Sequence, residues 1–337
     1  MATLLAPARL QELKENPAAI FGKRELIQEA ARTDMFPALL RDGIRAILFD
    51  SFAGVPTTYQ DLVDRVPSDK DEEVWTELER GGTLPIVGEG QEYPRAKFGQ
   101  RPPRRIRNYK RGEILEITEE LLRFDRTNQI RQWAQDFGAQ VAQTREQSFY
   151  DVITATGNYT QTSATNDIGN NTNATTFGFQ GLELAHSTLV TMKDRTSGRY
   201  FGVMPDTVIV TPRLRFAAGQ MLASDRLTYA MAGNTDNVPI YGAGTRNPFR
   251  DLNLRVVVSP YMGTSYQWCM MAARRAVKWQ VIEDMTILIQ DALRAEDSEA
   301  YFLFDVVRYR VRDWWGMGMY DDRFAYFSSS TTAPVVN

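Results

Sequence analysis

The sequence holds few of the side chains on which most enzyme mechanisms rely. It contains one histidine, His186, and one cysteine, Cys269. A Ser-His-Asp or Cys-His mechanism would have to use His186, and histidine and cysteine together could supply no more than a pair of metal ligands. Catalysis by carboxylates or lysine alone stays open. We expect His186 to be an ordinary structural residue, and the chain to have no catalytic, cofactor-binding or metal-binding residues.

Four further local patterns favour structure over chemistry. Residues 119–120 and 321–322 are adjacent carboxylates, and neighbours on a helix or strand point apart, which makes them poor acid–base pairs. The Gly-Met-Gly sequence at 316–318 lacks the further glycine, the lysine and the following helix of a phosphate-binding loop. Trp314 and Trp315 are expected to be core or interface aromatics rather than a platform for stacked bases.

A basic run is the strongest candidate for nucleic-acid binding. Its members are Arg101, Arg104, Arg105, Arg107, Lys110 and Arg111. The whole chain carries a net charge of -3, so any contact with nucleic acid is expected to be local or weak. Acidic residues lie shortly before the run, at Asp69, Asp71, Glu72, Glu73, Glu77 and Glu79. The alternative to nucleic-acid binding is a solvated strand face that pairs with acids of the same or another subunit, and we favour the pairing between subunits.

Composition and length describe a protein that can build real cores. The chain has 337 residues, of which 43% are hydrophobic and 11% aromatic. A lone cysteine forbids an internal disulfide, which is consistent with synthesis in a reducing cytoplasm. No apolar run reaches the ~20 residues that a membrane span needs, and the N-terminus lacks the apolar core of a signal peptide. We therefore expect a soluble protein that is not exported by the signal-peptide route.

The strongest helix is predicted over about 127–155. Apolar side chains recur along one stripe at Ile130, Trp133, Phe137, Val141, Phe149 and Val152. The opposite face is polar and includes Arg131, Gln132, Gln135, Asp136, Gln140, Arg145 and Glu146. A long helix with one apolar side is typical of a spine on which a sheet lies. Phe137→Asp is expected to destroy the fold, because it would bury an unpaired charge.

An irregular segment between two extended stretches predicts a projecting arm. Residues 59–66 and 73–78 have the pattern of short strands around a turn, and 104–117 is extended again. Residues 81–103 between them are broken by proline and glycine, which exclude a helix or a central strand. We predict a two-stranded arm over 74–117 with an irregular tip. Such an arm is only marginally stable alone and is expected to gain order against a neighbour.

The remaining segments divide between helices, strands and loops. An amphipathic N-terminal arm is expected over 1–56, and a polar surface loop over 156–176. A helix follows at about 178–193. Alternating strands and helices indicate a second α/β lobe over 205–296. The C-terminal part is extended, with a turn at 321–322, and its strands are expected to pair with the base of the arm and to lie on the spine helix.

This order of parts resembles the major capsid protein family of tailed bacteriophages, which has the Hong Kong 97 fold. The stretches that carry the resemblance are GEGQEYPRAKFGQRPPRRIRNYKRGEILEITEELLRFDRTNQIRQWAQDFGAQVAQTREQSFYDVI, PDTVIVTPRLRFAA, LRVVVSPYM and WWGMGMYDDRFAYF. The similarity extends over about 55–327 and lies in the order and spacing of the segments, not in fixed invariant residues.

The resemblance implies an α+β fold with a definite division of the chain. An N-terminal arm would occupy 1–56, strands with an extended loop 57–117, a peripheral domain 118–204, an axial domain 205–296, and a return to the peripheral domain with a C-terminal tail 297–337. Copies would self-assemble into hexamers and pentamers of an icosahedral shell in the virion, assembled in the host cytoplasm around packaged DNA. The predicted inter-subunit contacts are Trp75, Ile86, Tyr93, Arg95, Phe98, Arg104, Arg105 and Arg107.

Partners and departures also follow from the resemblance. A scaffolding protein and a portal are expected, a decoration protein is possible, and contact with packaged DNA should be weak and non-specific. Only about fifty residues precede the loop region, so the scaffold is expected to be a separate protein. Lys97 and Lys110 lie in the loop region, but no partner for a covalent cross-link is evident. Two alternatives stay open: an encapsulin shell that encloses cargo enzymes, and a cytoplasmic α/β enzyme.

Overall fold

The computed structural model describes most of the chain and divides it into two compact units. The described residues are 36–78, 84–96, 99–118, 129–159, 171–193, 198–226, 231–232, 239–241, 246–263, 265–289 and 306–334. The first unit takes Met1–Thr57, Tyr109–Glu146 and Val281–Trp315, and the second takes Thr58–Asn108, Gln147–Gln280 and Gly316–Asn337. Each unit is thus built from segments far apart in the sequence, as the return of the C-terminal strands predicted. The functional domain boundaries given above stay a prediction.

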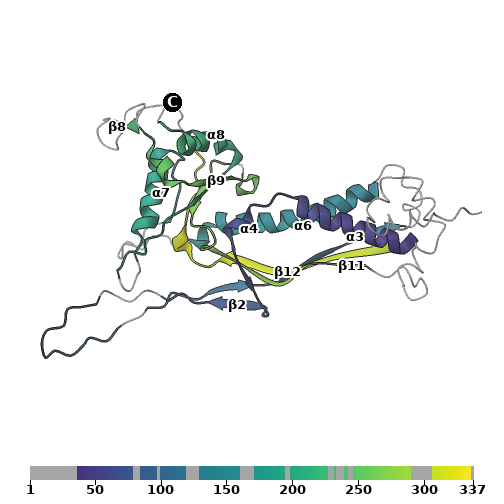
Figure 1. The fold of residues 1–337 in the computed structure, drawn as a ribbon, viewed down its shortest axis with the longest axis horizontal. Helices are drawn as coiled ribbons and strands as arrows, with labels where there is room; N and C mark the ends of the chain where they lie inside the picture. Colours follow the sequence, from purple (N-terminus) through teal and green to yellow (C-terminus); the bar gives the residue numbers. More distant parts are fainter. Residues whose placement is uncertain are drawn as a thin grey trace, which may run out of the picture. The chain divides into compact units, whose positions relative to one another are not determined.

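Two long helices run side by side in the first unit (Figure 1). Helix α3 covers Phe36–Gly54 and helix α6 covers Gln129–Thr154. Gly138 of α6 permits their close approach, because a Cβ atom at this position would lie 2.5 Å from the Leu48 carbonyl oxygen of α3. The predicted spine helix is therefore confirmed in place and length, and one glycine sets how tightly its partner packs.

The apolar stripe of α6 differs from the predicted one at Trp133. Ile130 is 2% exposed, Phe137 is 8% exposed and Phe149 is fully buried, while Val141 and Val152 are half-buried. Trp133 is 43% exposed, so its prediction as a core residue was wrong for the isolated chain. Position 133 has helical spacing with its apolar neighbours, but it lies at the edge of the stripe, where a large ring protrudes.

Two residues assigned to the polar face of this helix are buried instead. Arg145 is 3% exposed and Glu146 is 5% exposed. The guanidinium of Arg145 donates to both carboxylate oxygens of Asp313, each at 2.8 Å, and the Trp315 indole donates to the same carboxylate at 2.6 Å. Helical spacing cannot reveal this arrangement, because a bidentate ion pair lets an arginine occupy a core position.

A four-stranded sheet has the order β1-β11-β12-β4. Its strands are β1 (Asp64–Pro67), β11 (Val277–Ile289), β12 (Val306–Met319) and β4 (Tyr109–Thr118). Strands β12 and β4 are antiparallel and pair from Val306 opposite Thr118 to Trp315 opposite Tyr109. The C-terminal strand therefore pairs with the chain that follows the arm, as predicted. The sequence pattern of the C-terminal part predicts two separate strands, at 301–312 and 315–320, but over their described part they form one long strand, β12.

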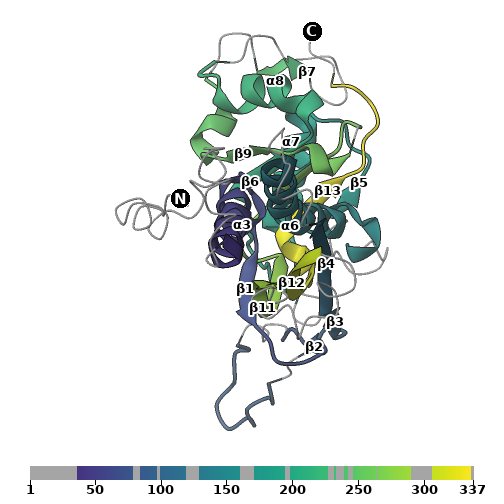
Figure 2. The ribbon, with the colours of Figure 1, turned by 90° about the vertical axis from the view of Figure 1, so that its right-hand side faces the viewer.

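The second unit contains a five-stranded mixed sheet of order β5-β13-β10-β6-β9. Its strands are β5 (Thr172–Asn173), β13 (Ala325–Ser328), β10 (Trp268–Met271), β6 (Thr207–Val210) and β9 (Arg255–Val258). Helix α7 (Phe179–Thr191) packs on β10 and β13. Figure 2 labels this helix and strand β13. The short helix α8 (Arg215–Ala218) continues into a π turn over Gly219–Ala223.

The core of this sheet is rich in aromatic side chains and methionine. Trp268 and Met270 are fully buried, and Tyr326 is 1% exposed. Asn171 is also fully buried, and strand β5 follows it directly. The polar loop predicted over 156–176 was therefore wrong at its end, where a short strand completes the sheet edge; residues 160–170 lie outside the described part. Polar composition predicted a surface loop there, but Thr172 lies opposite Phe327 in the sheet. The carbonyls of Asn171 and Asn173 accept hydrogen bonds from the amides of Phe327 and Ser329 at 2.9 and 3.0 Å.

A short hairpin carries the extended loop. Strand β2 (Glu72–Trp75) pairs antiparallel with β3 (Arg104–Arg107), and an isolated bridge joins Leu78 to Gln100. Residues 84–96 reach away from β2 in Figure 1. The predicted arm was too long, because 109–118 belongs to the four-stranded sheet. Residues 59–62 also form a helix, α4 (Tyr59–Leu62), and not the start of a strand.

Within the predicted second lobe, the sequence also indicates a loop at 233–248 that is rich in glycine and asparagine, and most of it lies outside the described residues. Its described part includes β8 (Pro239–Tyr241), which pairs with β7 (Met231–Ala232). Short 3-10 helices cover Thr156–Asn158, Pro212–Leu214, Pro248–Leu252, Pro260–Met262 and Asp322–Phe324. The last of these confirms the turn predicted at 321–322.

Candidate functional site

The loop tip, residues 84–96, exposes large apolar side chains. Leu84 is 97% exposed, Ile86 is 100% exposed and Tyr93 is 80% exposed. A turn at Gly88–Gln91 reverses the chain, with a hydrogen bond from the Gln91 amide to the Gly88 carbonyl at 3.1 Å. Gly90 has a φ of +77°, a conformation that side chains other than glycine's rarely adopt. Such a concentration of exposed apolar groups on one segment indicates a contact surface.

The predicted contact residues divide into two groups. Ile86, Tyr93 and Arg95 lie exposed on the loop tip, and Phe98 lies outside the described residues. Trp75 belongs to the hairpin and is already packed within the chain: its ring meets Tyr320 edge-on at 5.8 Å, and the Lys278 ammonium lies 4.2 Å from its centroid. No partner chain is present, so the inter-subunit role of all these residues stays a prediction.

The basic run pairs with acids of its own chain on the hairpin. Arg105 lies 3.7 Å from Glu72, and Arg107 lies 3.5 Å from Asp71. These partners are among the acids predicted from the sequence, and in the single chain the pairing occurs within one subunit. The pairing between subunits that we favoured stays a prediction. Arg105, Arg107 and Asp71 are largely exposed and Glu72 is half-buried, and ion pairs so open to solvent contribute little to stability.

Below the loop tip, six ionisable residues, four of them buried and two half-buried, form a cluster that we call the loop root. Its members are Glu77, Arg101, Arg104, Asp321, Asp322 and Arg323, all in the second unit. Arg101 lies 3.2 Å from Glu77, 3.3 Å from Asp321 and 3.0 Å from Asp322. Arg104 reaches Asp322 at 3.1 Å. Glu77 and Arg101 stand on the two opposite stems of the loop, so the cluster closes the loop at its base.

The C-terminal turn supplies two of the three carboxylates. Asp321 accepts a hydrogen bond from the Arg323 amide at 2.9 Å and so caps the short 3-10 helix. The Arg323 side chain donates to Asp321 at 2.7 Å and to Glu77 at 2.8 Å. Asn171 donates to the Asp322 carbonyl at 2.6 Å. The turn is therefore held by both stems of the loop and by the edge of the five-stranded sheet.

Burial dominates the electrostatics of the loop root. The three carboxylates balance the three arginines in formal charge. Even so, burial raises the pKa of Glu77 from 4.5 to about 7, and the nearby Asp321 raises it further, while Arg323 and Arg101 lower it. For Arg101, burial lowers the pKa, but Asp322 and Asp321 outweigh it, and the net shift is upward. The cluster thus combines permanent arginine charges with one carboxyl that titrates near neutral pH.

Sequence reasoning missed three residues that fit the hairpin against strand β12. Asn108 is 2% exposed, and its amide group donates to the Ser68 hydroxyl at 3.0 Å and the Lys70 carbonyl at 2.7 Å. A Cβ atom at Gly316 would lie 2.5 Å from the Arg107 carbonyl, and one at Gly318 would lie 2.8 Å from Ile106. The Gly-Met-Gly pattern was the available signal, and it marks close packing of strands.

The adjacent aspartates were interpreted incompletely. We expected their side chains to point apart, but both reach the guanidinium of Arg101. A 3-10 turn, unlike a strand or an α-helix, can place two neighbouring carboxylates on one partner. Their role here is structural, because buried arginines occupy them.

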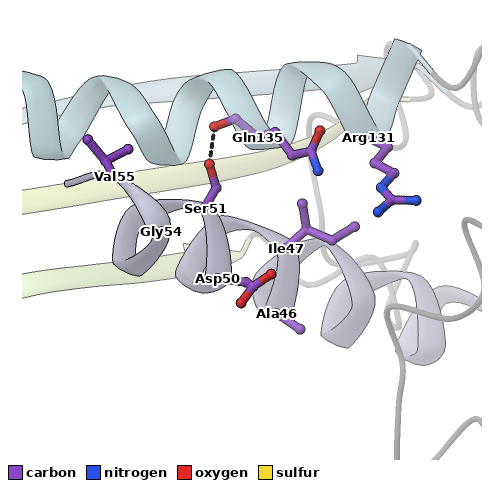
Figure 3. A pocket seen from close by; sticks show the side chains of 8 residues that line it. All are labelled: Ala46, Ile47, Asp50, Ser51, Gly54, Val55, Arg131 and Gln135. Atoms are coloured by element: carbon purple, nitrogen blue, oxygen red, sulfur yellow. Dashed lines mark hydrogen bonds between the residues drawn. The ribbon is translucent and has the colours of Figure 1, made fainter.

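The cavity between α3 and α6 offers no comparable arrangement for chemistry (Figure 3). It has a volume of about 710 Å³ and is lined by Ala46, Ile47, Asp50, Ser51, Gly54, Val55, Arg131 and Gln135. The Ser51 hydroxyl donates to the main-chain carbonyl of Gln135, so it is held as a structural group. Within the described part of the chain, no cluster of histidine, cysteine, aspartate and glutamate could hold a metal ion.

Two further observations concern His186 and the membrane. His186 lies in α7, and partial burial lowers its pKa. Among the residues that the structure describes, each helix is too short or too polar to cross a bilayer.

Comparison with known proteins places the chain among shell proteins of phages. A family model described as phage capsid protein matches residues 103–327, which is more than half of the chain. The match begins after the loop tip and includes Arg104 and the turn at 321–323 of the loop root. No protein of curated function matches the sequence.

Solved structures show the same fold at low sequence identity. The capsid structure of the cyanophage P-SCSP1u is 11% identical, with a TM-score of 0.56, and the match covers 82% of this chain and 89% of that one. The mature capsid of bacteriophage PhiM1 is 11% identical, with a TM-score of 0.52 and coverage of 83% and 89%. A chain of Mycobacterium phage Adephagia is 10% identical, with a TM-score of 0.52 and coverage of 85% and 94%.

Proposed function

The chain belongs to the phage capsid protein family, and from that premise we propose how its copies meet one another. It is a major capsid protein with an α+β fold, located in the capsid of the virion, and its family is structural, so it does not act as an enzyme. The matching family is one of phage capsid proteins, so an encapsulin shell is not favoured. Self-assembly into a closed shell is the function that follows.

The loop tip is the contact through which one subunit reaches the next. Ile86 is completely exposed and Leu84 nearly so, and burying one large aliphatic side chain contributes about 1.5–3 kcal/mol. The described residues of the chain do not cover these groups. A neighbouring copy can, and the many repeated contacts of a shell allow each one to be weak. The exposure of Ile86 and Leu84 is the observation that carries this proposal.

The rest of the assembly follows the family. We assign residues 1–56 to an N-terminal arm, 118–204 with 297–337 to a peripheral domain, and 205–296 to an axial domain. The loop at 233–248 would gather around the axes of hexamers and pentamers in an icosahedral shell. A scaffolding protein, a portal and a decoration protein are proposed partners, assembly would occur in the host cytoplasm, and packaged DNA would touch the shell weakly.

Replacing the loop tip tests the proposal. Residues 84–96 are exchanged for a Gly-Ser linker of equal length, which leaves Glu77 and Arg101 in place. The free energy of unfolding is measured in the unassembled subunit, and shells are counted by negative-stain electron microscopy. We expect a subunit of unchanged stability that forms no closed shells.

A control in the same segment removes charge instead of apolar surface. Glu89→Ser combined with Glu92→Ser keeps all apolar side chains of the loop tip and should form normal shells. Closed shells of normal size from the linker variant would refute the proposed contact.

A further inference from the structure

The loop tip has nothing of its own to fix its direction. Its residues are almost all exposed, and the hydrogen bonds among its described residues stay within the turn at Gly88–Gln91. The last described pairing between the two stems is the bridge of Leu78 with Gln100. Within the described part of the two stems, control over where the loop points therefore lies at this bridge or directly below it.

The residues next to the bridge are those of the loop root. Glu77 precedes Leu78 on one stem, and Arg101 follows Gln100 on the other. The Arg101 amide donates to the Glu77 carbonyl at 3.1 Å, and the two side chains meet at 3.2 Å. Glu77 and Arg101 thus join the two stems through both their main chains and their side chains.

A third element anchors this junction to the body of the second unit. Arg101 also binds Asp321 and Asp322, whose side chains are 2% and 1% exposed. The turn that holds them leads directly into β13, where Tyr326 and Phe327 are each 1% exposed in the core of the five-stranded sheet. The guanidinium therefore connects a projecting loop to a rigid core through three acceptors.

We propose that the loop root is a clamp that sets the direction in which the loop leaves the second unit, with Arg101 as its positioning residue. This inference rests on the proposed role of the loop in assembly. Buried ion networks are a poor way to gain stability, because desolvation offsets most of their attraction. Their advantage is geometric: a planar guanidinium fixes the directions of several carboxylates at once.

Arg105 provides the contrast on the same hairpin. It is also an arginine with a glutamate partner on the opposite strand, but its side chain is 70% exposed and the pair distance is 3.7 Å. Among the described residues, it forms no ion pair with the C-terminal turn at 321–323. Loss of Arg105 removes the same charge as loss of Arg101 and should leave the direction of the loop unchanged.

Pulsed electron paramagnetic resonance between two spin labels measures this direction. One label is placed on the loop tip by Glu89→Cys and the other on helix α7 by Glu183→Cys, both exposed positions of the second unit. Burial raises the pKa of the native Cys269 thiol to about 12, so that residue stays unlabelled. The full chain is labelled in its unassembled form.

The labelled parent protein should give one narrow distance distribution. Arg101→Ala should abolish the narrow peak, and Arg105→Ala should retain it. Arg101→Lys restores the charge without the planar fork and should recover part of the peak. An unchanged narrow distribution in Arg101→Ala would overturn the clamp. If Arg101→Ala does not fold, the width of the distance distribution in Arg101→Lys tests the clamp instead, and a distribution as narrow as the parent's would overturn it. Failure of both variants to fold would also overturn a positioning role.

Shell formation by the same variants separates the clamp from the proposed function. A broadened distribution with normal shells would support the clamp and refute the role of the loop in assembly. A narrow distance distribution with aberrant shells would refute the clamp and leave the role of the loop in assembly supported. A broadened distribution together with irregular or absent shells is the expected result.

Discussion

The tip of the extended loop exposes apolar side chains, whereas its root buries ionisable ones. At the tip, Ile86 and Leu84 stand almost fully in water. At the root, the ionisable Glu77 and the charged Arg323 are only 7% and 5% exposed. A monomeric protein would normally reverse these choices, with apolar groups inside and charges outside.

This contrast separates two requirements of a shell subunit. Exposed apolar surface at the tip costs the subunit little while it is alone and becomes favourable only when another copy covers it. The buried charges at the root act within the subunit and depend on the directions of their partners. Changes at the root should therefore alter the stability of the single chain, and changes at the tip should alter assembly alone.

The largest effect is expected from Arg323→Ala at the root. The substitution removes the partner that Glu77 meets at 2.8 Å and Asp321 at 2.7 Å, and leaves their carboxylates buried. Breaking a buried ion pair from one side destabilises by about 3–5 kcal/mol. Urea unfolding of the unassembled subunit measures this loss. Arg105→Ala is the matched control and should change the free energy of unfolding by less than ~0.5 kcal/mol. Equal effects of the two substitutions would remove the distinction between root and surface.

The second prediction concerns the titration of Glu77. Its pKa is raised from 4.5 to about 7 by burial, so the folded chain holds this proton more tightly than the unfolded chain. Between these two pH values the unfolded state has lost the proton and the folded state has kept it. The free energy of unfolding should therefore fall as pH rises from 4.5 to 7, by at most about 3 kcal/mol.

Glu77→Gln isolates this contribution. Glutamine cannot titrate, so the decrease assigned to position 77 should vanish, and the variant should be at least as stable as the parent at pH 8. The charged groups that face position 77 are Arg101, Arg323 and Asp321, and all three remain. Urea unfolding at intervals from pH 4.5 to 8 gives the comparison. Parallel pH curves for the two proteins would show that Glu77 is charged throughout this range.

The sequence was sufficient to locate the tip but not the root. Proline and glycine between 81 and 103 exclude regular structure, which makes a projection predictable from local chemistry alone. The root joins Glu77 and Arg101 to a turn more than two hundred positions later, at separations of 220 and 221 from Arg101. No local pattern encodes such a contact. The acid–base pairing of the hairpin was foreseen, but whether it acts within or between subunits depends on strand register.

The spine helix shows the same division between local and distant information. Its length and most of its buried stripe follow from helical periodicity. Trp133 and Arg145 depart from it in opposite directions, because one ring lies at the margin of the stripe and one arginine finds a bidentate partner on β12. The spacing of apolar residues predicts which side chains of the helix are buried. Contacts with residues far away in the sequence determine which side chains depart from that prediction.

A smaller loss of subunit stability is expected from Gly316→Ala, at the contact between β12 and the hairpin. A Cβ atom there would lie 2.5 Å from both the Arg107 carbonyl and the Asn108 side-chain oxygen, so β12 would have to move away from the hairpin. Overpacking of this kind costs about 1–3 kcal/mol. Thermal unfolding provides the measurement. Gly157→Ala is the control, because a Cβ atom at Gly157 meets nothing within 4 Å. A destabilisation no greater than that of the control would mean that the two strands do not need this close approach.

The smallest change in subunit stability is expected from Ile86→Ser at the tip. Ile86 is 100% exposed, so its loss should alter the free energy of unfolding by less than ~0.5 kcal/mol. Its burial by a neighbour would contribute about 1.5–3 kcal/mol, which corresponds to a critical concentration for assembly raised roughly ten- to hundredfold. Light scattering over a concentration series measures this threshold, with Glu89→Ser as the control in the same turn.

The two measurements on Ile86→Ser must differ for the contrast between tip and root to hold. A loss of stability in the unassembled subunit would mean that the isolated chain already covers this side chain, and the tip would then resemble the root. An unchanged stability with an unchanged assembly threshold would mean that no neighbour covers it. Ile86 is a contact for another copy only if its loss raises the critical concentration for assembly and leaves the free energy of unfolding of the subunit unchanged. In that case the side chain is exposed in the single chain and buried in the shell.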